Sequence, residues 1–265
     1  MNLGLNGKSA IVTGGSRGIG FAVATTLAAE GADVALAGRD LAALERAAAT
    51  IASGQNVTVL TVTVDTTDDS SVRAMVARVA AEFGGVDILV NGAATAAGGP
   101  APGLAALTDA EMREEFETKV LGYLRCARAV APHMIDGGWG RIVNIAGLNA
   151  RQANSIAGSI RNVSVAAMTK NLADELGPAG VGVTVVHPGI TVTERTPALL
   201  ADLAAREGST ADHIADQLGA ATSIGRLVTA AEVADVVVFL CSPRSVAVTG
   251  DAVAVGGGAR GAIYY

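Results

Sequence analysis

The sequence has few aromatic residues and no long apolar run. Aromatic side chains account for 3% of the 265 residues, whereas hydrophobic residues account for 50%. Alanine and valine supply much of this hydrophobic content, and such small side chains suit closely packed layers of helices and sheet. No apolar run approaches the roughly 18 residues that a membrane-spanning helix needs, and the N-terminal residues lack a signal-peptide pattern. We therefore expect a cytoplasmic protein with no membrane partner.

The sequence also has only two cysteines and no excess of positive charge. Cys126 and Cys241 are far apart in the sequence and have no metal-ligand spacing. We expect two buried thiols in a reducing cytosol and no metal site. The formal net charge is −6. A protein that binds nucleic acid usually presents a basic face, so we expect no nucleic-acid partner.

Glycine, in contrast, is abundant, and one glycine-rich segment stands out. Residues 13–20 (TGGSRGIG) follow a short apolar run and precede small and apolar residues typical of a helix. Strand, glycine-rich turn and helix form the setting in which such a turn binds phosphate. Glycines allow close backbone approach to a pyrophosphate, and the N-terminus of a helix offers unpaired N–H groups and a positive dipole end. The segment predicts a phosphate-binding loop.

Short apolar runs alternate with helical patterns along the rest of the chain. Strands alternating with helices imply right-handed parallel crossovers and a doubly wound sheet. No change in composition indicates a second domain, so we expect residues 1–265 to form a single α/β domain of about seven strands. The expected strands are 8–12, 32–38, 57–64, 86–90, 141–145, 181–186 and 251–255. The expected helices are 21–30, one that Asp40 caps, 68–83, 108–135, 158–176 and 229–240, with a helical excursion over 190–227.

Five segments, in this order, carry a family resemblance: 13–20, 91–94, 140–145, 188–193 and 248–251. Together they resemble the short-chain dehydrogenase/reductase family over nearly the whole chain. The resemblance implies a Rossmann-type sheet in which 91–94 closes under the nucleotide and 188–193 holds the nicotinamide carboxamide. The cofactor-binding residues that it implies are Gly14, Ser16, Arg17, Gly18, Ile19, Gly20, Arg39, Asp65, Thr66, Asn91, Gly92, Ala93, Pro188, Gly189, Ile190 and Thr193.

The end of the second expected strand indicates which nucleotide binds. An acidic residue usually holds the ribose 2′-hydroxyl of NAD at this point, but here Gly38 and Arg39 precede the first carboxylate, Asp40. The planar guanidinium of Arg39 suits a 2′-phosphate, and Arg17 offers a second cation. We expect NADP(H) in preference to NAD(H); the alternative is that both arginines are solvated. Asp65 resembles the adenine-contacting aspartate, or else caps the strand end.

The resemblance does not extend to the family's catalytic residues. Members use a tyrosine as the proton donor or acceptor, a lysine four residues later, a serine that binds the substrate oxygen, and an asparagine in the long helix. The corresponding positions here hold Gly158, Asn162, Gly147 and Lys119. No shift of the alignment restores the tyrosine, because none occurs between Tyr123 and Tyr264.

Several residues are candidates for the missing roles. Burial beside a cofactor depresses the pKa of a lysine, so Lys119 is a candidate for acid–base catalysis; alternatively it supports the loop or pairs with Glu115 or Glu117. Asn162 is a candidate for hydrogen bonding to the nicotinamide ribose.

Weaker candidates lie elsewhere in the sequence. Arg161 and Asn149 are candidates for binding a substrate oxygen, although ordinary structural contacts are the simpler interpretation. Tyr264 and Tyr265 would act only from a neighbouring subunit, and Tyr123 suits a core or an interface. His133 and His187 are expected to be structural.

Three functions remain open. The first is an NADP(H)-dependent oxidoreductase that acts on a carbonyl or alcohol of an apolar small molecule, with a rearranged proton transfer. The second is a nucleotide-binding sensor or assembly partner without catalysis, and the third is a non-redox enzyme that reuses the pocket. Residues 94–107 and 190–227 are expected to form the pocket walls. The resemblance also implies a homo-tetramer or homo-dimer built on helices 108–135 and 158–176 and the strand 250–255.

Overall fold

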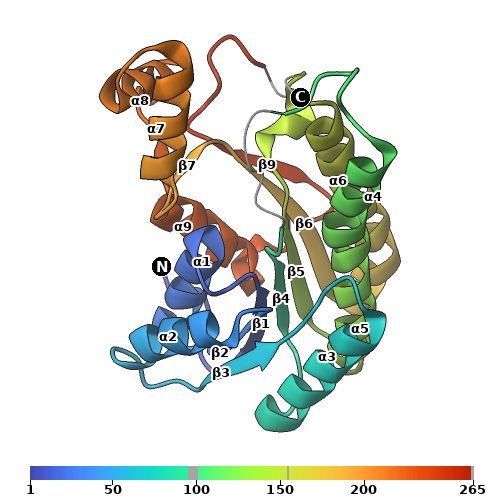
Figure 1. Ribbon diagram of the computed structural model, residues 1–265. Helices are drawn as coiled ribbons and strands as arrows, with labels where there is room; N and C mark the ends of the chain where they lie inside the picture. Colours follow the sequence, from blue (N-terminus) through green and yellow to red (C-terminus); the bar gives the residue numbers. More distant parts are fainter. Residues whose placement is uncertain (95–100, 154, 264–265) are drawn as a thin grey trace.

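The computed structural model describes residues 1–94, 101–153 and 155–263, and Figure 1 shows their arrangement. Seven strands form one sheet in the order β3-β2-β1-β4-β5-β6-β9, and every neighbouring pair is parallel. The fold is therefore the expected α/β doubly wound sheet. The strands are β1 (Ser9–Thr13), β2 (Asp33–Gly38), β3 (Val59–Thr63), β4 (Ile88–Asn91), β5 (Gly140–Ile145), β6 (Val181–Pro188) and β9 (Ala252–Val255).

Helices cover both faces of this sheet (Figure 1). One face packs against α1 (Gly18–Ala29), α2 (Leu41–Ala52) and α9 (Ala230–Leu240). The other face packs against α3 (Asp69–Phe83), α5 (Gly122–Asp136) and α6 (Ile156–Leu176). The inner strands β2, β1, β4, β5 and β6 are thus buried on both faces, which explains why most of them are short apolar runs. The edge strands β3 and β9 are only partly buried.

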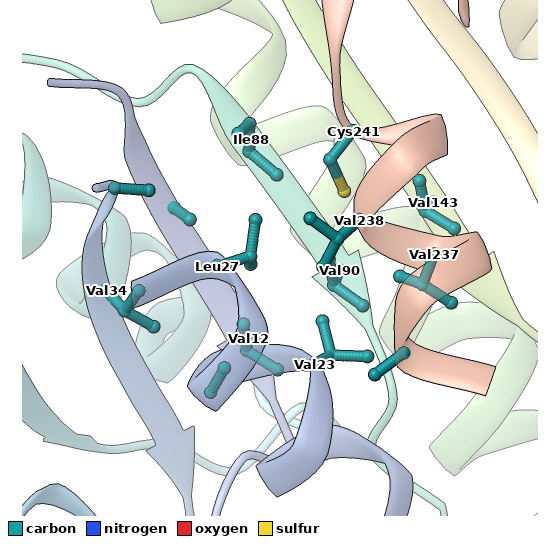
Figure 2. Close-up of a cluster of buried hydrophobic side chains, with 14 of the residues drawn as sticks. Val12, Val23, Leu27, Val34, Ile88, Val90, Val143, Val237, Val238 and Cys241 are labelled. Carbon is teal, nitrogen blue, oxygen red and sulfur yellow. The ribbon is translucent and has the colours of Figure 1, made fainter. Parts of the chain in front are cut away.

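The core is built from small branched side chains. Figure 2 shows Val23 and Leu27 of α1 facing Val237 and Val238 of α9 above β1 and β4. All four are fully buried. Valine and alanine let the helices approach the sheet closely, so a core with few aromatic residues still packs densely.

The helix starts agree with the capping signals. Asp40 accepts a hydrogen bond from the backbone N–H of Ala43 and caps α2. Thr108 and Glu111 form a capping box at α4 (Asp109–Glu115). The helix expected over 108–135 is not a continuous α-helix, however, because a π-helical turn, η1 (Phe116–Leu121), lies between α4 and α5. The helix expected from 158 begins two residues earlier, at Ile156.

The expected helical excursion after β6 contains two helices and two short strands. α7 (Thr196–Glu207) and α8 (Ala211–Ala220) lie between β7 (Thr191–Val192) and β8 (Val228–Thr229), which pair in parallel. In Figure 1, α7 and α8 project beyond the sheet. Among the described residues, no helix has the length and apolarity to cross a membrane.

Candidate functional site

A cleft of about 950 Å³ lies at the carboxyl ends of the strands. Its lining includes residues that end or directly follow β1, β2, β3, β4, β5 and β9. The sheet order reverses between β1 and β4, and ligands of doubly wound sheets bind at such a switch point. Seventeen of the expected site residues line the cleft: Gly14, Ser16, Arg17, Gly18, Ile19, Gly20, Arg39, Asp65, Thr66, Gly92, Ala93, Lys119, Asn162, Pro188, Gly189, Ile190 and Thr193.

The glycine-rich loop requires glycine at defined positions. Gly14 and Gly18 have φ angles of +71° and +56°, in the left-handed region that other residues rarely adopt. A Cβ at position 20 would lie 2.3 Å from the carbonyl oxygen of Gly14. Arg17 occupies the N-cap position of α1 without a side-chain capping hydrogen bond. The loop therefore presents the N-terminus of α1 to the cleft without a cap from the Arg17 side chain, which suits an anion.

A carboxylate from a distant part of the chain reaches this helix terminus. The backbone N–H of Gly18 donates a hydrogen bond of 3.1 Å to Oε2 of Glu194. Glu194 follows β7, at the start of the excursion, and lines the same cleft. The N-terminus of α1 thus already interacts with one anionic group of the protein itself.

Two arginines and one aspartate lie at the end of the cleft next to β2 and β3. Arg17 and Arg39 are exposed and line the cleft. Asp65 accepts hydrogen bonds from the backbone N–H and hydroxyl of Thr67, and these bonds, with a smaller contribution from Arg39, lower the pKa of the Asp65 carboxyl. These contacts agree with the expectation that Asp65 caps the end of the strand. Asp65 also lines the cleft.

Asn91 differs from the other expected site residues because it is fully buried and does not line the cleft. Its Nδ2 donates to Oδ1 of Asn144 at 2.9 Å, and Nδ2 of Asn144 donates to Oγ1 of Thr169. Asn91 and Asn144 are register partners in β4 and β5, so their side chains meet within the sheet. Asn91 holds the strand ends together, while Gly92 and Ala93 reach the cleft.

Lys119 lies in η1 with its side chain in the wall of the cleft. The residue is 5% exposed, and its Nζ donates a hydrogen bond of 2.8 Å to the carbonyl oxygen of Ala146. Burial lowers the pKa of the Lys119 ammonium from 10.5 to about 8, because desolvation disfavours the charged form.

The expected alternative pairing of Lys119 with a glutamate is not found. Glu115 forms an ion pair with Arg161, and Glu117 forms one with Arg125 at 2.5 Å. The hydrogen bond to Ala146 does support the loop after β5, in keeping with the other alternative. Lys119 is therefore a buried cation of lowered pKa without a carboxylate partner among the described residues.

Asn162, in α6, faces the loop after β5. The residue is 2% exposed, and its Oδ1 is buried without a hydrogen-bond partner among the described residues. Asn149 and Arg161 also line the cleft. Below this wall, His187 accepts a hydrogen bond of 3.4 Å at Nδ1 from the backbone N–H of Gly147. Burial, with Arg151 as a second cause, lowers the pKa of His187 to about 4, so this imidazole is neutral.

No tyrosine of the described part of the chain lines the cleft. Tyr123 is buried and donates its hydroxyl hydrogen to the carbonyl oxygen of Ile145. Burial raises the pKa of its phenol, so Tyr123 is a core residue, as expected. Tyr264 and Tyr265 lie outside the described residues.

The segment 190–227, expected to form a pocket wall, does contribute to the cleft. Four of its lining residues come from α8 and the loop after it: Leu218, Ala221, Thr222 and Leu227. Of the other expected wall segment, 94–107, Ala94 lines the cleft, and residues 95–100 lie outside the described residues.

The sequence reasoning did not identify the segment after β9, which also lines the cleft through Gly256 and Ala259. Nothing in the local sequence marks these two residues, because only the fold brings their segment to the cleft.

Comparisons with known proteins agree with this geometry. A family model described as enoyl-(acyl carrier protein) reductase matches residues 14–260. The short-chain reductase protein NovJ of Streptomyces niveus is 34% identical over 252 residues, which are 94% of this chain and 92% of NovJ. The 3-oxoacyl-(acyl-carrier-protein) reductase FabG of Escherichia coli is 34% identical over 261 residues, with 97% and 98% covered. The chain belongs to the short-chain dehydrogenase/reductase family of oxidoreductases.

A solved structure extends this likeness to the whole short-chain dehydrogenase/reductase fold. The L-sorbose reductase of Gluconobacter frateurii, in complex with NADPH and L-sorbose, has a TM-score of 0.91 and 30% identity to this chain. The match covers 99% of this chain and all of the other. The family resemblance inferred from the five sequence segments is thereby confirmed.

Proposed function

We propose that this chain is an NADP(H)-dependent oxidoreductase that acts on a carbonyl or alcohol group of an apolar small molecule through an atypical active site. The observation that carries the proposal is the position of Lys119. A buried ammonium with a pKa of about 8 lines the same cleft as the glycine-rich loop. A group with a pKa near the working pH is well suited to move a proton.

The residues of the cleft fit a dinucleotide with a 2′-phosphate. The glycines of the 13–20 loop and the N-terminus of α1 would hold the pyrophosphate, and Arg17 and Arg39 would hold the 2′-phosphate. The unpartnered Oδ1 of Asn162 would accept a hydrogen bond from the nicotinamide ribose. NADPH in the L-sorbose reductase complex supports this preference.

Lys119 supplies the proton in the proposed reaction. The cofactor provides the hydride chemistry when bound. The ammonium of Lys119, oriented by the carbonyl oxygen of Ala146, donates a proton to the substrate oxygen during reduction. The neutral amine accepts it during oxidation. This role replaces the tyrosine and lysine that the family resemblance assigns to Gly158 and Asn162.

The proposed substrate is apolar because several aliphatic side chains line the cleft. Leu148, Ile190, Leu218 and Leu227 contribute to this lining. In an aliphatic or aromatic ketone, the carbonyl group would contact the polar lining residues and the apolar remainder would contact the aliphatic ones.

The experiment has two stages. NADPH and NADH are titrated against the protein by cofactor fluorescence, and a panel of ketones and secondary alcohols is then screened for turnover. We expect NADPH to bind more tightly than NADH and at least one apolar ketone to be reduced. Tight binding without turnover on the whole panel would favour the non-catalytic sensor, and failure to bind either nucleotide would refute the proposal.

The proton-transfer role of Lys119 has a matched control. Lys119→Met should lower kcat at least about 100-fold while NADPH affinity stays within about threefold. Lys170→Met, which removes an exposed lysine paired with Asp174, should leave kcat unchanged. An unchanged kcat in Lys119→Met would refute the assignment.

We also propose that the protein is a cytoplasmic homo-tetramer or homo-dimer. Both cysteines are unpaired and buried, as in a reducing compartment. Ile156, Ile160 and Val163 expose apolar side chains on α6, one of the helices expected in the subunit interface. Light scattering after size-exclusion chromatography would give the mass, and a monomer would refute this part.

A further inference from the structure

Two glycines, Gly147 in the wall of the cleft and Gly158 in α6 behind Asn149, lie next to asparagine amides. A Cβ at position 147 would lie 3.0 Å from Nδ2 of Asn162. A Cβ at position 158 would lie 2.9 Å from Nδ2 of Asn149. An amide NH₂ group therefore lies within 3.0 Å of each point where a larger residue would begin its side chain, and at position 158 the Ser155 hydroxyl is equally close, at 2.8 Å.

The two asparagines belong to elements that pack against each other. Gly158 and Asn162 are four residues apart in α6, so their Cβ positions lie about 5–6 Å apart on one face of the helix. Asn149 lies in the short turn η2 (Leu148–Arg151) directly after Gly147. Both asparagines line the cleft. Nδ2 of Asn162 and Nδ2 of Asn149 are thus two N–H donors on side chains that line one cleft.

The proposed proton donor is held next to the same loop. Lys119 Nζ donates a hydrogen bond to the carbonyl oxygen of Ala146, the residue before Gly147. The lining of the cleft thus combines two neutral amide donors with one ammonium. The two amide atoms of Asn162 would bind different groups. In the proposed function its Oδ1 accepts a hydrogen bond from the nicotinamide ribose, which leaves Nδ2 as the donor to another ligand.

We propose that Asn149 and Asn162 donate hydrogen bonds to the carbonyl oxygen of a ketone substrate and stabilise the negative charge that develops on it. This inference rests on the proposed function. In reduction, the carbonyl carbon accepts a hydride from NADPH, and the electron pair of the C=O double bond moves to oxygen. The oxygen then takes a proton from the Lys119 ammonium, which becomes a neutral amine. Both amides keep their protons, because they act only as preorganised donors.

The test measures polarisation of the carbonyl without turnover. Acetophenone with a ¹³C-labelled carbonyl is bound together with NADP⁺, which cannot donate a hydride, and the carbonyl stretch is recorded by infrared difference spectroscopy. We expect a lower frequency in the wild-type complex than in Asn149→Leu or Asn162→Leu, which keep the side-chain volume but remove the donor. Asn171→Leu is the control, because Asn171 is an exposed residue of the same helix. Its frequency should equal the wild-type value.

Kinetics give a second readout. Each leucine variant should lose about 100-fold in kcat. The pH at which the rate begins to decline should equal the wild-type value, because the pKa of Lys119 sets it. Equal carbonyl frequencies in the wild type and both variants would overturn the inference. So would a NADP⁺-loaded protein that shows no band for a bound ketone with either acetophenone or an alkyl ketone. Failure to bind NADP⁺ at all would instead overturn the proposed function.

Discussion

Arg39 and Lys119 occupy different ends of the cleft and have different roles in the proposed function. Arg39 is exposed at the end of β2, where its charge is solvated and its reach is long. Lys119 is buried in η1, where its charge is costly and its geometry is fixed by Ala146. The first position suits recognition of a charged ligand, and the second suits a group that gains and loses a proton.

Arg39→Ala should discriminate between the two nucleotides. Loss of a charge-assisted hydrogen bond costs about 1.5–3 kcal/mol, so NADPH affinity should fall about 10- to 100-fold while NADH affinity stays within about twofold. Fluorescence titration measures both. Arg46→Ala, in an exposed position of α2 outside the cleft lining, is the control. Equal losses for the two nucleotides would contradict the 2′-phosphate assignment.

The burial of Lys119 should also affect stability. Its folded-state pKa of about 8 lies below its ordinary 10.5, so the unfolded chain holds more protons between these pH values, and the free energy of unfolding rises with pH there. Lys119→Met removes this titration. The free energy of unfolding of the wild type should therefore rise by about 2 kcal/mol relative to that of Lys119→Met between pH 7 and pH 10. Urea unfolding at both pH values measures the difference, and a pH-independent difference would contradict the lowered pKa.

The hydrogen bond between Gly18 and Glu194 connects two elements that are far apart in the sequence. It brings the start of the excursion to the N-terminus of α1, where the pyrophosphate is proposed to bind. An anion near a helix N-terminus is stabilised by about 0.3–1 kcal/mol, so Glu194 would compete with the nucleotide for the same backbone donors.

Glu194→Gln should therefore tighten NADPH binding about two- to fivefold. Salt should reduce the effect, because exposed charges are screened. Glu207→Gln, at the exposed end of α7, is the matched control and should bind NADPH like the wild type. Weaker binding by Glu194→Gln would show that Glu194 supports the cofactor site rather than competing for it.

The order of elements could be predicted from the sequence, whereas the contacts between distant elements could not. Apolar runs and capping residues such as Asp40 and Thr108 are local signals, so the seven strands and most helix starts follow from them. The π-helical turn around Lys119 has no such signal, because the residues of η1 would also suit an α-helix.

Part of the candidate site was equally inaccessible to sequence reasoning. The inward orientation of Asn91 depends on its register with Asn144, and the approach of Glu194 to Gly18 spans 176 residues. Such placements arise from packing of the whole sheet and excursion. The glycine-rich loop and Lys119 could be identified because their residue types were unusual at those positions.

At the scale of the whole molecule, we propose that residues 1–265 form one cooperative domain. Trp139 is the single tryptophan. It lies just before β5, at the opposite end of the strands from the cleft, and its ring contacts the cations of Lys8 and Arg141. Its fluorescence and the far-ultraviolet circular dichroism should therefore give coincident urea transitions, both shifted upward by NADPH. A separate early transition in circular dichroism would show that α7 and α8 unfold independently.

The pH dependence of ketone reduction at saturating NADPH tests the central claim most directly, because the proposed reaction takes its proton from the Lys119 ammonium. His187, which contacts the loop after β5, has a pKa of about 4 and stays neutral above pH 5. We predict that kcat/KM for the ketone is constant from pH 6 to pH 7.5. It should then fall toward a tenfold loss per pH unit above about pH 8, as the Lys119 ammonium deprotonates. A profile that stays flat to pH 10 would contradict the account.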